Sequence, residues 1–215
     1  MVLACAPTME TVSRSSTVLP LVLLLLSSIR GAFGDQFQWP LSLKQALSST
    51  FAESRSTAFH MGIDLKTWGK TGFEVRAPAG GYVERLRTSP WGYGRALYLK
   101  LKDGRTLVFA HLSEFEPRSA RRVEQAQEES NRYSVDLWLV PEEIIVNKGD
   151  FIARTGASGV GPPHLHLEMR DKNNVALNPL EHGFNVTDTT KPTITAVALI
   201  PIDAESTVNG IHQAL

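Results

Sequence analysis

The chain has 215 residues, of which 42% are hydrophobic and 20% are charged, and its 22 basic residues balance 22 acidic ones. This length allows one ordinary domain with appendages, and the apolar content excludes an intrinsically disordered chain. The balanced charge argues against nucleic acid as a partner, because nucleic-acid-binding surfaces carry an excess of basic residues.

The first 34 residues have the pattern of a signal peptide. An apolar run from Val18 to Leu26 follows Arg14, and the small residues Ala32 and Gly34 precede an expected cleavage site near Asp35. The run is too short for the core of a bilayer, which needs about 20 residues, so we expect no permanent membrane span. We therefore expect removal of residues 1–34 and export to the periplasm or cell envelope.

The only cysteine, Cys5, lies inside this segment. The mature chain would therefore contain neither a disulfide nor a cysteine-based metal site.

A β-hairpin is predicted in the middle of the chain. Apolar residues alternate along residues 95–101, and Asp103-Gly104 predicts a two-residue turn before a second strand at residues 106–110. That turn would pair Leu101 with Thr106 and Leu99 with Val108, and it would leave His111 at the open end of the ladder, near a sheet rim.

The next segments continue the β pattern with one interruption. Residues 117–132, rich in Arg, Glu and Gln, predict a short solvated helix or an excursion from the sheet. Strands are predicted at residues 135–140 and 151–155, and a tight Gly- and Pro-rich loop follows at residues 156–163. A further strand is predicted at residues 192–200, which would either dock on the main sheet or begin a further β-domain. The fold class is therefore all-β with a minor helix.

The segment His164-Leu165-His166-Leu167-Glu168 carries the clearest chemical signal. Residues two apart on a strand point the same way, so His164, His166 and Glu168 share one face while the leucines share the other. The alternative is a pair of histidines on an ordinary solvated face. Glu168 is either a carboxylate that orients an imidazole or a solvent-exposed group.

An imidazole and a carboxylate also occur close together earlier in the chain. His60 and Asp64 flank a glycine, Gly62, that could turn the chain so that both side chains reach one point. Alone, this spacing is typical of an incidental surface pair. Combined with the later histidines it supplies two imidazoles and one carboxylate, a set that suits a catalytic zinc ion with its fourth position open. His111 is either part of such a site or a rim histidine bonded to backbone.

Four segments in order resemble the lysostaphin/LytM-type zinc endopeptidases, and together they span about residues 57–182. They are Phe59-His60-Met61-Gly62-Ile63-Asp64-Leu65, the run from Val75 to Val83, Phe109-Ala110-His111-Leu112-Ser113, and the run from Gly161 to Glu168.

The resemblance implies twisted antiparallel sheets that form an open groove with one zinc ion on its floor. It implies His60, Asp64 and His166 as the zinc ligands and His111 and His164 as catalytic residues outside the metal shell, without dividing the two roles. Residues 35–58 would then be a lead segment, residues 59–182 the endopeptidase domain with an insertion at 117–147, and residues 183–215 a linker and the first strand of a further, truncated β-domain.

The resemblance also implies a peptidoglycan peptide as substrate, cleaved at a stem-peptide cross-link or at a glycine-rich bridge. One alternative is a non-catalytic member that binds and activates another cell-wall hydrolase, although intact metal ligands argue against it. Another is an exported β-domain in which all the histidine clusters are incidental.

Overall fold

The computed structural model describes residues 37–55 and 58–187, together with Lys191, residues 193–197, Leu199, Asp203 and residues 205–207. It divides into two units, Met1–Asn185 and Val186–Leu215, which are treated separately below. The predicted signal peptide and Cys5 lie outside the described residues.

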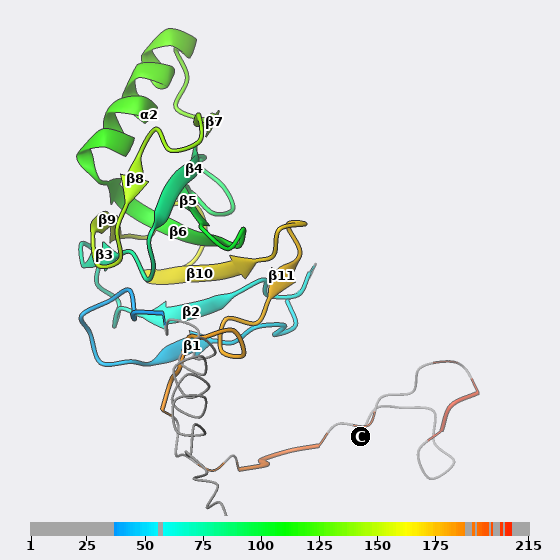
Figure 1. Cartoon of the computed structure of the whole chain (residues 1–215). Helices are drawn as coiled ribbons and strands as arrows, with labels where there is room; N and C mark the ends of the chain where they lie inside the picture. The colour runs from blue at the N-terminus through cyan, green and yellow to red at the C-terminus, as the bar shows by residue number, and fades with distance from the viewer. Residues whose placement is uncertain are drawn as a thin grey trace, which may run out of the picture. The chain divides into compact units, whose positions relative to one another are not determined.

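Eleven strands of the first unit form one sheet in which every pairing is antiparallel, so the all-β prediction is confirmed. The main path of neighbours runs β1-β2-β10-β6-β5-β4-β7, and Figure 1 shows β10 between β2 and β6. The strands are β1 (Leu47–Ser49), β2 (Ile63–Lys66), β3 (Glu74–Arg76), β4 (Gly81–Thr88), β5 (Arg95–Leu101), β6 (Thr106–Phe115), β7 (Val135–Trp138), β8 (Ile145–Val146), β9 (Phe151–Thr155), β10 (His164–Arg170) and β11 (Ala176–Leu177).

The hydrophobic core takes alternate residues from the central strands, as the period-two pattern predicts. Leu97 and Leu99 of β5 and Leu165 and Leu167 of β10 are fully buried in one cluster. Complete burial of a leucine side chain contributes about 1.5–3 kcal/mol. The residues between them on β10 face the opposite side, which is where the imidazoles lie.

The register of the predicted hairpin is wrong by one residue. Lys100, and not Leu101, is paired with Thr106, and Leu99 is paired with Leu107. The loop has three residues, because the Leu101 N–H donates to the Arg105 carbonyl at 2.8 Å. Gly104 makes this loop possible: its φ of +89° lies in the left-handed region that glycine adopts readily.

The strand that carries His111 is longer than predicted. β6 does not end at Ala110; it pairs with β10 up to that residue and with β9 from Leu112 onward. His111 lies between the two ladders, with a φ of 59°. Its N–H donates to the Tyr93 carbonyl at 2.9 Å. The pairing with β5 also shifts here, so β6 has a β-bulge at His111. A bulge bends its strand and redirects the side chain that it carries.

The segment at residues 117–132 contains α2 (Pro117–Ser130), so the helical alternative is the correct one. The Glu116 carboxylate accepts hydrogen bonds from the Arg118 and Ser119 N–H groups at the N-terminus, and Pro117 occupies the first turn, where no N–H is needed. At the other end Asn131 adopts the left-handed conformation of a helix cap. Across the described ranges of the chain, no helix has the length and apolar content of a membrane span.

The described residues of the second unit carry no helix or strand. The strand predicted at residues 192–200 is not formed at residues 193–197 or at Leu199. The proposed further β-domain stays a prediction.

Candidate metal centre

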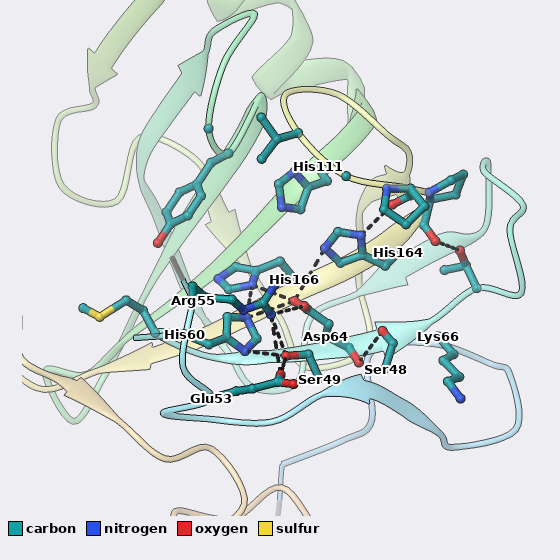
Figure 2. A pocket seen from close by; sticks show the side chains of 18 of the residues that line it. Ser48, Ser49, Glu53, Arg55, His60, Asp64, Lys66, His111, His164 and His166 are labelled. Carbon is teal, nitrogen blue, oxygen red and sulfur yellow. Dashed lines mark hydrogen bonds and ion pairs between the residues drawn. The ribbon is translucent and has the colours of Figure 1, made fainter. Parts of the chain in front are cut away.

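Three donor atoms from two segments that are distant in sequence converge in a buried cluster. The distance from His60 Nε2 to His166 Nδ1 is 3.0 Å, from His60 Nε2 to Asp64 Oδ1 3.1 Å, and from His166 Nδ1 to Asp64 Oδ1 2.8 Å. All three residues are buried. Figure 2 shows their polar ends pointing toward one another. We call these three residues the ligand group.

The sheet brings the ligand group together. β2 and β10 are neighbours, and their register places Asp64 directly opposite His166. Gly62 does not act as the turn that the sequence suggested, because it lacks a left-handed φ. It allows a close approach instead: a Cβ atom there would lie 2.3 Å from the Leu167 carbonyl oxygen of β10.

Hydrogen bonds on the far side of each imidazole orient the two histidines of the ligand group. His60 Nδ1 lies 2.8 Å from the Thr50 carbonyl oxygen, which can only accept, so Nδ1 carries the proton and Nε2 keeps its lone pair. His166 Nε2 lies 3.0 Å from Glu168 Oε1, which leaves the lone pair on Nδ1. In the neutral rings both lone pairs therefore point toward Asp64, as metal binding requires, whereas a protonated ring would donate a hydrogen bond to Asp64 from the same nitrogen.

Glu168 is fully buried, so the solvent-exposed alternative is wrong. Besides His166, its carboxylate accepts hydrogen bonds from the Tyr93 hydroxyl and from Arg170 Nε, the latter at 2.7 Å. Burial alone would raise the pKa of Glu168, but the hydrogen bond from His166 and the charges of His166 and Arg170 outweigh it and lower that pKa. Glu168 is therefore an ionised anchor for the His166 ring.

The electrostatics of the ligand group suit a cation. Burial alone would raise the pKa of Asp64, but hydrogen bonds from His166 and His60 hold it well below its ordinary value. Burial alone would lower the pKa of His166, but hydrogen bonds to Asp64 and Glu168 raise it. A buried carboxylate that stays charged needs a positive partner, either a proton on an imidazole or a metal ion.

His111 and His164 lie beside the ligand group, with their ring centroids 4.5 Å apart. His111 Nδ1 lies 2.9 Å from the Ser158 carbonyl oxygen, and His164 Nδ1 lies 2.6 Å from the Pro162 carbonyl oxygen. Each Nδ1 is therefore the protonated nitrogen, and each Nε2 is free to accept a proton. His164 Nε2 is 3.5 Å from Asp64 Oδ1. Burial lowers the pKa of His111 to about 4, which keeps its imidazole neutral at neutral pH.

The five histidine and aspartate residues line one pocket of about 840 Å³. Apolar side chains on its rim are exposed, among them Phe59, Met61, Trp68 and Val160. The lining therefore combines apolar side chains with a few converging polar groups, as ligand-binding sites commonly do. Of the remaining histidines, His182 is exposed on a turn and His212 lies outside the described residues.

Sequence reasoning missed three contributors to this site. Ser49 of β1 lies 3.1 Å from His60 Nδ1, Arg55 donates to Asp64 Oδ2 at 3.2 Å, and Tyr93 reaches Glu168. Ser49 and Arg55 belong to the predicted lead segment, whose strand β1 pairs with β2. For Tyr93, the only local sequence signal was the glycine on each side of it, and this signal was weak.

No family model matches the chain. The chain is 31% identical over 152 residues to an uncharacterized metalloprotease of Haemophilus influenzae, and the match covers 66% of this chain and 26% of that protein. The chain therefore spans about a quarter of the length of this curated relative. The sequence similarity confirms the resemblance to metalloproteases that the motifs indicate.

Solved structures similar to this one include a zinc-containing peptidase from Vibrio cholerae. It has a TM-score of 0.49 and 22% identity, over 66% of this chain and 39% of that chain. The catalytic domain of the antimicrobial peptidase lysostaphin from Staphylococcus simulans has a TM-score of 0.48 and 20% identity, over 64% of this chain and 91% of that chain.

Proposed function

We propose that the chain is an exported zinc metalloendopeptidase of the lysostaphin type that hydrolyses peptide bonds in peptidoglycan. The observation that carries the proposal is the convergence of His60, Asp64 and His166 on one point, beside two further imidazoles and inside one pocket. The motifs shared with lysostaphin-type enzymes and the similarity to a metalloprotease support it.

The ligand group fits zinc. Zinc prefers imidazole and carboxylate ligands at about 2.0–2.2 Å in a tetrahedron, whose ligand atoms are then roughly 3.3 Å apart. The three donor atoms are 2.8–3.1 Å apart and need only small shifts. Three protein ligands are the number found at catalytic zinc sites, whereas structural sites use four.

A bound zinc ion would supply an activated water and polarise the scissile carbonyl. The imidazoles of His111 and His164 would do the proton transfers, because the Nε2 of each can take a proton from the attacking water and deliver it to the leaving nitrogen. When protonated, the same Nε2 atoms would donate hydrogen bonds to the negative charge that develops on the carbonyl oxygen. The carbonyl groups of Ser158 and Pro162 hold both rings in the tautomer that this requires.

The test is to incubate the purified chain with purified muropeptides, with and without a chelator, and to measure product masses. The proposal predicts new products that gain the mass of one water, disappear with the chelator and return when zinc is added back. Zinc binding without any product would favour the non-catalytic binding module instead. Neither zinc binding nor hydrolysis would overturn the proposal.

A further inference from the structure

The side chain of Arg55 places a guanidinium at the edge of the ligand group. Arg55 precedes His60 by five residues, and its backbone N–H donates to the Ala58 carbonyl at 2.9 Å. Its Nη2 atom donates to Asp64 Oδ2 at 3.2 Å and to the Ser49 hydroxyl at 2.6 Å. Figure 2 shows Arg55 directed toward the same point as His60, Asp64 and His166.

Much of the Arg55 guanidinium remains available to bind a ligand. The Arg55 side chain is 48% exposed, and its interactions with the described residues all use Nη2. Apart from Asp64, the anion beside it is Glu53, whose Oε2 is 3.7 Å from Nη2, beyond hydrogen-bonding distance. An arginine has five donors in a planar fork, so the remaining edge of Arg55 can still bind a carboxylate through two hydrogen bonds.

The charge of the pocket favours an anionic ligand. Its lining has two cationic side chains, Arg55 and Lys66, and two anionic ones, Glu53 and Asp64. These charges cancel, so a divalent cation in the ligand group would leave the pocket positive. Lys66 points away from the ligand group in Figure 2, which leaves Arg55 as the cation that a ligand beside the metal would meet.

The position of Arg55 limits how far along the substrate the anion can lie from the metal. Its Nη2 is only 3.2 Å from a ligand carboxylate, and one extended residue spans about 3.3–3.6 Å. A carboxylate bound by Arg55 therefore lies within about one to two residues of a carbonyl held at the metal, and the nearest such position is the first of these. On a peptide, that is the carboxylate on the carbon that bears the leaving nitrogen.

We propose that Arg55 binds a free α-carboxylate on the residue that supplies the leaving amine. This inference rests on the proposed function. This carboxylate can end a chain, or it can belong to a diamino acid whose amine forms a cross-link. A leaving glycine inside a bridge has its carboxyl group in an amide and offers no such anion. Arg55 therefore favours stem-peptide bonds over bonds within a glycine bridge.

The test compares ligands that differ only in this carboxylate. The first pair is acetyl-D-alanyl-D-alanine and its carboxamide. The second pair is acetyl-D-alanine joined to one amine of diaminopimelic acid, with the adjacent carboxyl group free or amidated. Binding is measured by calorimetry on the zinc-loaded His111→Asn protein, and hydrolysis is measured on the zinc-loaded unmodified protein. The two pairs distinguish a chain end from a branching residue.

We expect the free acid of at least one pair to bind about 10- to 100-fold more tightly than its amide. This is the gain in affinity that two charge-assisted hydrogen bonds provide. Arg55→Gln should reduce this preference to less than about threefold, and Arg55→Lys should retain part of it. Lys66→Gln removes the same charge from the same pocket and should leave the preference intact. Melting temperatures of the variants show whether the fold is kept.

Equal binding of acid and amide in both pairs would overturn the assignment of Arg55. So would a preference that survives Arg55→Gln, or one that Lys66→Gln removes equally well. A carboxylate preference in binding with no hydrolysis of any peptide would support this anion site while contradicting the proposed enzymatic function.

Discussion

Asp64 and His166, 102 residues apart in sequence, lie directly opposite each other on β2 and β10, with Asp64 Oδ1 2.8 Å from His166 Nδ1. The pair is therefore positioned by sheet register and not by a flexible loop. A one-residue slip between these strands would move one of the two side chains to the other face of the sheet. The candidate metal site is consequently as rigid as the ladder that contains it.

This dependence on the sheet gives a prediction for Gly62. A Cβ atom at this position would lie 2.3 Å from the Leu167 carbonyl oxygen, so Gly62→Ala must push β2 away from β10. We expect a loss of about 1–3 kcal/mol in the free energy of unfolding and at least a tenfold loss of zinc affinity. Gly80→Ala is the control, because its nearest neighbour would be 3.5 Å away. If the two variants behaved alike, the close approach would not matter.

His111→Asn separates metal binding from proton transfer. Asparagine tolerates the left-handed backbone at this position, so the substitution removes the ring with little strain. We expect turnover to fall about 10²- to 10⁴-fold while zinc content stays at one ion per chain. His182→Asn, on an exposed turn, should change neither. An active His111→Asn protein would show that His111 is not catalytic.

Glu168 should act on zinc affinity through the orientation of His166. Glu168→Ala removes the acceptor of the His166 Nε2 proton, and we expect zinc affinity to fall about 10- to 100-fold. Glu168→Gln keeps an acceptor oxygen and should lose less. Glu74→Ala, at an exposed carboxylate remote from the site, serves as the control. Unchanged zinc affinity in Glu168→Ala would contradict the anchoring role.

Zinc affinity should decrease as the pH falls. A histidine must lose its proton to bind metal, and hydrogen bonds to Asp64 and Glu168 outweigh burial and raise the pKa of His166 above 6.5 in the metal-free chain. Lower pH therefore means more protonated His166 and weaker binding, and the decrease should begin above pH 6.5. Competition with a chelator of known proton affinity, from pH 8 to pH 5.5, measures it. A constant affinity across this range would be incompatible with an imidazole ligand set.

The sequence predicted those parts of the site that depend on local periodicity. The alternation along β10 correctly separated His166 and Glu168 from the core leucines, because a strand has a fixed two-residue repeat. The hairpin register was missed because Asp103-Gly104 fits both a two-residue and a three-residue loop, and only the hydrogen bond from the Leu101 N–H to the Arg105 carbonyl in the folded ladder distinguishes them.

Contacts between distant segments could not be predicted in the same way. Tyr93 meets Glu168 across 75 positions, and Arg55 meets Asp64 from outside the recognisable motifs. The bulge at His111 arises where β6 changes partner from β10 to β9, which is a property of the whole sheet. No short pattern encodes any of these relationships.

The account depends most on a metal ion held by His60, Asp64 and His166, and elemental analysis after equilibrium dialysis against zinc tests this directly. The unmodified chain and His182→Ala should each retain one zinc ion per chain. Asp64→Ala and His166→Ala should each retain almost no zinc, although circular dichroism should show that their secondary structure is preserved. An unmodified chain without bound zinc, or folded Asp64→Ala and His166→Ala proteins that each still bind one equivalent, would contradict the account.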